Sequence, residues 1–109
     1  MQIILTDSNF QKEVLECPQP VVVKFSADWS GACHMMTPMI EELAKEFKGQ
    51  IKICSLDIDD NKRVAKRYGI CELPTFLFFK NSQVIDHIVG AIPKKILAAR
   101  FKAMLQTES

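Results

Sequence analysis

The sequence predicts a single α/β domain built around a mixed β-sheet. Apolar runs rich in β-branched residues, which are typical of strands, alternate along the chain with segments whose apolar residues recur at helical spacing. The length of 109 residues suits one domain with one hydrophobic core. Because no repeat, low-complexity tract or linker divides the chain, we assign residues 1–109 to one domain.

The first half of the chain predicts the order β-α-β-α. A short strand is expected at residues 3–5, and residues 6–9 supply capping side chains for a helix that follows it. Residues 21–25 form a continuous apolar run, which favours a strand covered on both faces. The next apolar stripe predicts a long helix that ends near Phe47 and is kinked at Pro38.

The second half predicts the order β-α-β-β-α. The expected elements are a strand at 51–58, a short helix through Tyr68, strands at 75–80 and 84–89, and a final amphipathic helix from Pro93. We expect residues 59–61 to cap the short helix and Asn81-Ser82 to turn a β-hairpin. The complete order is β-α-β-α-β-α-β-β-α, a central mixed sheet flanked by helices.

The charge pattern argues against a nucleic-acid or membrane partner. The net charge of +1 arises from 14 basic and 13 acidic residues that are interspersed along the chain. No apolar stretch approaches the ~18 residues needed to cross a bilayer, and the N-terminal residues lack a signal-peptide pattern. We therefore expect a cytoplasmic protein, or one in an organelle matrix if a transit peptide has been removed. We also expect a monomer.

The four cysteines are expected to be reduced thiols. Cys17, Cys33, Cys54 and Cys71 are too widely spaced for a zinc knuckle, and a core this apolar needs no disulfide to stabilise it. We expect Cys54, in a covered strand, to pack as a small apolar residue. The residues predict neither a metal site nor a bound cofactor.

The segment Trp29-Ser30-Gly31-Ala32-Cys33 carries the main functional signal. It corresponds to a redox Cys-x-x-Cys motif in which serine replaces the first cysteine. In such a motif the first thiolate attacks a substrate disulfide, and the second thiol resolves the mixed disulfide. The motif therefore indicates redox chemistry. Its usual first step is not possible here, because a hydroxyl cannot perform thiol–disulfide exchange.

Several further segments at consistent spacing resemble thioredoxin over essentially the full length of the chain. They are Phe25-Ser26-Ala27-Asp28-Trp29, Gly31-x-Cys33, Met36, Pro38, Leu56-Asp57-Ile58-Asp59, Tyr68-Gly69-Ile70, Leu73-Pro74-Thr75-Phe76, Phe79-Lys80-Asn81 and Val89-Gly90-Ala91. The resemblance implies a thioredoxin fold and a protein disulfide oxidoreductase, with Ser30 in the attacking position and Cys33 in the resolving position. It also implies a substrate surface formed by Trp29, Gly31, Ala32, Leu73, Pro74, Gly90 and Ala91.

The resemblance further implies that the Leu73–Pro74 peptide bond is cis and faces the motif. The residues alone would favour a trans bond there. Cys71 lies three residues before Pro74, so it is a candidate substitute thiol or a partner for Cys33. His34 stands where thioredoxins often have lysine, and its charge could tune the site near neutral pH.

Two departures from the thioredoxin pattern concern charge and capping. Ser30 is a good N-cap, because its oxygen can accept a backbone N–H at the start of the long helix. Lys24 stands where thioredoxins usually carry a buried aspartate, and Ser55 matches the usual lysine partner. Lys24 either lowers the pKa of Cys33 by charge proximity or extends from its strand to the surface; we favour the second.

Three functions remain open from the sequence. In the first, serine has replaced the attacking cysteine of an otherwise complete disulfide oxidoreductase, which would act on protein disulfides or thiols. A thioredoxin reductase would recycle the form with cysteine restored at Ser30. In the second, Ser30 and Lys24 mark a natural, non-catalytic peptide-binding module. In the third, Cys33 acts alone as a monothiol.

Overall fold

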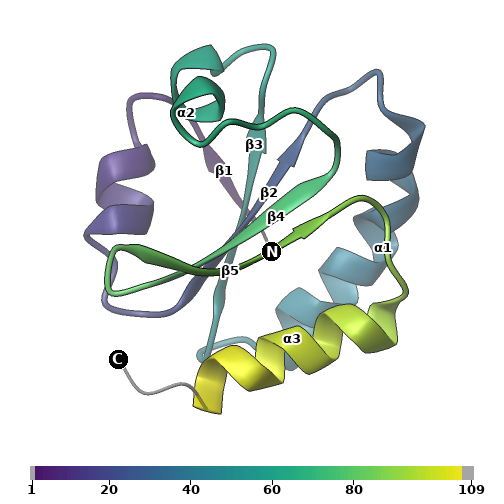
Figure 1. Ribbon diagram of the computed structural model, residues 1–109. Helices are drawn as coiled ribbons and strands as arrows, with labels where there is room; N and C mark the ends of the chain where they lie inside the picture. Colours follow the sequence, from purple (N-terminus) through teal and green to yellow (C-terminus); the bar gives the residue numbers. More distant parts are fainter. Residues whose placement is uncertain (1, 107–109) are drawn as a thin grey trace.

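Five strands form one mixed sheet in the order β1-β3-β2-β4-β5, as the computed structural model of residues 2–106 shows (Figure 1). The elements are β1 (Ile3–Leu5), η1 (Gln11–Leu15), β2 (Val21–Ser26), α1 (Gly31–Glu46), β3 (Lys52–Asp57), α2 (Lys62–Arg67), β4 (Thr75–Lys80), β5 (Gln83–Val89) and α3 (Lys94–Gln106). The predicted order of elements is confirmed, and each predicted strand lies within one or two residues of the observed one.

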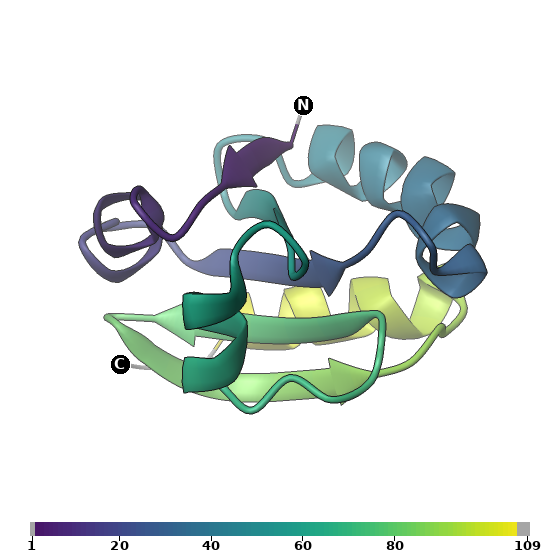
Figure 2. The same cartoon turned by 90° about the horizontal axis from the view of Figure 1, so that it is seen from above.

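The sheet is parallel on one side and antiparallel on the other. Strands β1 and β2 both pair with β3 in parallel, whereas β4 is antiparallel to β2 and β5 is antiparallel to β4. Figure 2 shows β1 at one edge and the β4–β5 hairpin at the opposite edge. The predicted hairpin turn is confirmed, because Asn81 and Ser82 both have positive φ values, 52° and 69°, as a tight primed turn requires.

Strand β2 is buried on both faces, as its continuous apolar run predicts. Val22 packs in a core layer with α1 and α3, and this layer includes Phe76, Phe78, Leu97 and Phe101. Val21, Val23 and Phe25 point to the other layer, under η1 and α2. Since α1 begins a few residues after β2 ends, the segment 27–30 lies at the carboxyl end of this central strand.

The first helical segment departs from the predicted α-helix. It is wound as a short π-helix, in which the N–H of Glu16 donates to the carbonyl of Gln11 at 3.0 Å. Its capping signal is partly confirmed. Thr6 and Asn9 bond each other reciprocally, since Thr6 N donates to Asn9 Oδ1 at 2.7 Å and Asn9 N donates to Thr6 Oγ1 at 3.1 Å.

The predicted local cap of α2 is wrong. Asn61 is the N-cap residue, but its side chain makes no capping bond to the helix. The carboxylate of Asp7 accepts the N–H groups of Arg63 and Val64 instead. The cap therefore comes from the turn after β1, far away in the sequence.

Helices α1 and α3 occupy the predicted parts of the chain. Helix α1 runs through Pro38 and ends at Glu46, with Phe47 as its C-cap. Helix α3 buries Leu97, Phe101 and Met104, while the neighbouring Leu105 is 36% exposed. Within the described residues, no helix combines the length and apolar composition that a membrane crossing requires.

Candidate active site

Ser30 begins helix α1 and uses its hydroxyl as the helix cap. Its backbone is extended, with φ −90° and ψ 110°, and its Oγ accepts a hydrogen bond from the N–H of Cys33 at 3.3 Å. Its own N–H donates to the carbonyl of Ala27 at 3.1 Å, and the residue is 8% exposed. The predicted capping role of Ser30 is therefore confirmed.

Cys33 lies in the first turn of α1 and is nearly enclosed. The residue is 3% exposed, and its carbonyl oxygen accepts a hydrogen bond from Lys24 Nζ at 3.0 Å. Thr37 Oγ1 approaches the same carbonyl at 3.5 Å. A bulky disulfide therefore meets little of the Cys33 surface, although the backbone around the sulfur is held firmly.

Lys24 is a buried cation, so the expectation that it extends to the surface is wrong. It lies on β2 directly beside Ser55 on β3, and it is 6% exposed. Among residues 2–106, no carboxylate forms an ion pair with it. Burial lowers the pKa of the Lys24 amine, and the attraction of a Cys33 thiolate acts against that lowering.

A small polar pocket of about 190 Å³ opens beside these two residues. Its lining includes Lys24, Cys33 and the hydroxyl-bearing residues Ser26, Thr37 and Ser55. Gln2, Ala27, Asp28 and His34 complete the lining. The pocket therefore gives small molecules a route toward a residue that is otherwise enclosed.

The loop before β4 and the end of β5 meet through one backbone hydrogen bond. The Leu73–Pro74 peptide bond is cis, as the resemblance implied, and Pro74 is buried. The N–H of Gly90 donates to the carbonyl of Pro74 at 2.7 Å, and Gly90 adopts a φ of +92° that favours glycine. The bond brings two of the predicted substrate-binding segments together, with Ala91 exposed beside them.

Trp29 presents its indole to solvent next to the cap. The residue is 69% exposed, and its Nε1 donates to Asp59 Oδ2 at 2.9 Å. Gly31 is also exposed, whereas Ala32 is half-buried. No local pattern in the sequence indicates this role of Asp59, because the two partners are 30 residues apart.

The comparison with known proteins agrees with this geometry. The sequence model of the thioredoxin family matches residues 1–103. The chain belongs to the thioredoxin family. It is 44% identical to Thioredoxin 1 of a Nostoc species over 94 residues, which cover 86% of this chain and 88% of that protein. It is 45% identical to the thioredoxin of Rickettsia felis over 93 residues, 85% of this chain and 89% of that protein.

A longer plant protein is also similar to this chain, over part of its own length. The chain is 43% identical to the rice protein Thioredoxin M5, chloroplastic, over 96 residues, which cover 88% of this chain and 56% of that protein. The mixed sheet with helices on both faces is thus a thioredoxin fold. Membership of the family supports a function in thiol–disulfide oxidoreduction.

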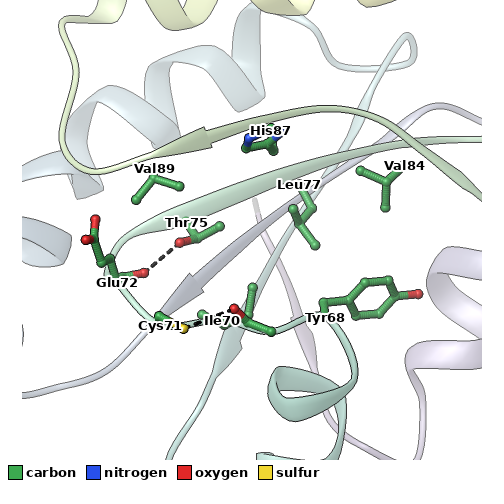
Figure 3. Close-up of a pocket in the computed structure, with 10 residues that line it drawn as sticks. Tyr68, Ile70, Cys71, Glu72, Thr75, Leu77, Val84, His87 and Val89 are labelled. Atoms are coloured by element: carbon green, nitrogen blue, oxygen red, sulfur yellow. Dashed lines mark hydrogen bonds between the residues drawn. The ribbon is translucent and has the colours of Figure 1, made fainter.

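The remaining thiols of the chain do not line the small pocket beside Cys33. Cys71 is exposed, and it lines a separate pocket of about 530 Å³ over the β4–β5 hairpin, with Leu77, Val84 and Val89 (Figure 3). Its Sγ donates to the carbonyl of Gly69 at 3.4 Å. Cys33 lines the other pocket, so the two thiols do not share a cavity.

Cys54 packs as predicted, as a small apolar residue in β3. It is fully buried, and burial raises the pKa of its thiol to about 12. Cys17 is half-buried at the end of η1. Among the described residues, no cluster of three or more His, Cys, Asp or Glu side chains could hold a metal ion.

The flanking residues His34 and Met35 face outward. His34 is exposed, and its Nε2 lies 2.7 Å from the carbonyl oxygen of Asp28. Met35 is 79% exposed, although it lies in the first turns of α1 between the buried Cys33 and Met36. The imidazole of His34 is thus fixed beside the small pocket, whose lining it shares with Cys33.

Proposed function

We propose that this protein is a thioredoxin-type disulfide oxidoreductase whose dithiol cycle is interrupted at Ser30. The proposal rests chiefly on one observation: the side chain in the attacking position is a hydroxyl that caps α1 and accepts the N–H of Cys33. Dithiol exchange needs a first sulfur to form the mixed disulfide and a second sulfur to release it. Here only the second sulfur, Cys33, stands at the site, and it is nearly enclosed.

The proposed partners are protein segments that carry a disulfide or a thiol. These partner segments would bind to a contact surface formed by three parts of the chain. They are the exposed Trp29, the cis Leu73–Pro74 segment and the Gly90-Ala91 segment. A thioredoxin reductase would be the partner of the form with cysteine restored at position 30. We propose that the protein is a monomer and that it acts in the cytoplasm.

Reduction of insulin disulfides by dithiothreitol tests the proposal. The native chain is compared with Ser30→Cys and with the double variant Ser30→Cys/Cys33→Ser, which has one thiol at the site. We expect only Ser30→Cys to accelerate the reaction, because only that form has both sulfurs. Equal acceleration by the native chain would contradict the proposal.

A second candidate function is a non-catalytic module that holds a partner peptide. The observation that favours it is Lys24, buried at 6% exposure beside Ser55, where thioredoxins usually have an aspartate and a lysine. Replacement of one cysteine does not account for these two further changes. If Ser30→Cys also fails to accelerate insulin reduction, while the chain retains peptide binding at Trp29, the binding function is the one to retain.

A further inference from the structure

In the part of the chain that the structure describes, no carboxylate lies within ion-pair distance of the Lys24 amine, although Asp28 lines the same small pocket. Its ammonium has three N–H donors, and the carbonyl oxygen of Cys33 accepts one of them at 3.0 Å. A buried charge is costly unless it is paired. The position therefore favours an anion or a strong acceptor near Lys24 and Cys33.

The small pocket beside Lys24 has a second unsatisfied group. Gln2 lines the pocket, and its Oε1 is buried without a hydrogen-bond partner among the described residues. Buried oxygens of this kind are normally satisfied. The pocket thus offers donors from Lys24 and an acceptor from Gln2 to a molecule that can both accept and donate.

The size of the pocket limits what can enter. At about 190 Å³ it takes a few water-sized molecules, and it is far too small for a peptide disulfide such as glutathione disulfide. Hydrogen peroxide is small, and it both donates and accepts hydrogen bonds. Disulfides would have to reach Cys33 from the surface, where the residue is 3% exposed.

We propose that this pocket is a site for hydrogen peroxide and that Cys33 is the sulfur that the peroxide oxidises. The Cys33 sulfur attacks one peroxide oxygen, so that an S–O bond forms and the O–O bond breaks. The proton of the Cys33 thiol passes by way of the Lys24 amine to the leaving hydroxide, which becomes water. The sulfur is oxidised by two electrons to a sulfenic acid, and the peroxide is reduced.

The serine at position 30 affects what happens to Cys33 after its oxidation. A sulfenic acid normally condenses with a neighbouring thiol to form a disulfide. The Ser30 hydroxyl, which accepts the backbone N–H of Cys33, cannot do so, and Cys71 lines a different pocket. The oxidised Cys33 persists until an external small thiol reduces it. This inference holds whether or not the protein acts on disulfides.

Trapping of the sulfenic acid with dimedone after a hydrogen peroxide pulse tests the inference, with peptide mass spectrometry reporting each cysteine separately. Cys54, buried with a pKa of about 12, and the exposed Cys71 serve as references in the same sample. We expect Cys33 to be labelled at least about ten-fold faster than Cys54, and faster than Cys71. Glutathione disulfide should modify Cys71 before Cys33.

The matched variants are Lys24→Met, which removes the buried charge at similar length, and Lys48→Met, which removes an exposed one. Lys24→Met should slow the labelling of Cys33 by about ten-fold or more and leave Cys71 and the buried Cys54 unchanged, because unfolding would expose Cys54 and raise its labelling. Lys48→Met should change neither. The inference is overturned if Cys33 is labelled no faster than Cys54, if Lys24→Met has no effect, or if glutathione disulfide reacts with Cys33 as readily as with Cys71.

Discussion

The carboxylate of Asp7 accepts the backbone N–H of Val64 at 2.9 Å and so caps a helix that begins 55 positions later in the sequence, at Lys62. The same carboxylate accepts the N–H of Arg63 at 3.2 Å, and Asn61 Oδ1 accepts the N–H of Asp7 at 2.9 Å. Helix α2 leads into the loop with the cis proline. The turn after β1 therefore helps to fix one wall of the site.

Replacement of Asp7 by alanine should destabilise the protein by about 1–2 kcal/mol, the usual loss for a helix cap. Urea denaturation measures the change in the free energy of unfolding, and hydrogen exchange at Val64 should show the local loss of protection. Asp60→Ala is the matched control, since Asp60 is exposed and precedes α2 in sequence. A larger loss for Asp60→Ala than for Asp7→Ala would favour the local cap that the sequence predicts.

The cap of α1 by Ser30 makes a second prediction about stability. Ser30→Ala removes the oxygen that accepts the N–H of Cys33 and should cost about 1 kcal/mol, whereas Ser30→Gly should cost only a few tenths. Glycine at a helix cap leaves backbone N–H groups open to water, which partly compensates. Thermal and urea denaturation of both variants provide the measurement, and equal losses for alanine and glycine would count against a capping role.

The sequence predicted those parts of the fold that local pattern determines. Three features depend only on residues that are close together in the sequence. They are the continuous apolar run of β2, the Asn81-Ser82 turn and the capping side chain of Ser30. Contacts across the fold left no such signal. The Asp7 cap of α2 and the hydrogen bond from Trp29 to Asp59 join segments that only the tertiary structure brings together.

Lys24 shows why the site was harder to predict than the fold. A lysine in a strand ordinarily extends along the apolar surface until its amine reaches water. Here α1 covers that face of β2, and the amine ends at the carbonyl of Cys33. The spacing of residues along β2 contains no information about this, because the enclosure comes from a helix that follows the strand.

The burial of Lys24 predicts that Lys24→Met raises stability at neutral pH, by about 1–2 kcal/mol, because an apolar side chain avoids the cost of an unpaired buried charge. The pKa of Lys24 is lowered in the folded protein, so between that value and the ordinary lysine pKa the unfolded chain binds more protons. The stability of the native protein therefore rises with pH across this window, and the advantage of Lys24→Met shrinks.

Urea denaturation of both proteins at pH 7 and at pH 9.5, under reducing conditions, tests this pH dependence. Lys48→Met serves as the control, since an exposed lysine should show no such trend. A stability difference between Lys24→Met and the native chain that stays constant with pH would mean that the amine is not penalised by burial. If Lys24→Met is less stable than the native protein at both values of pH, the hydrogen bond from Lys24 to Cys33 stabilises the protein by more than the buried charge costs.

The ion pair between Asp86 and Arg100 joins β5 to α3 and supports the segment 90–93 between them. Arg100 contacts both carboxylate oxygens, with Nε 2.6 Å from Oδ2, and it also donates to the carbonyl of His87 at 3.1 Å. Asp86 and Arg100 are 28% and 40% exposed, so solvent screens the pair in part and Arg100→Met should cost only about 1 kcal/mol near pH 7. Lys94→Met, in the same helix but with exposed partners, should cost less.

Acid should abolish the difference between the native protein and Arg100→Met. The guanidinium of Arg100, through its hydrogen bonds to the carboxylate, lowers the pKa of Asp86 below its ordinary value. The contribution of the pair is therefore fully present above the unfolded pKa of about 3.9, and it is lost as the pH falls through the lower folded value. Urea denaturation at pH 6 and pH 3 should show the gap closing. If the gap persists in acid, Arg100 stabilises the hairpin through packing and its bond to His87, and Asp86 is not the group that matters.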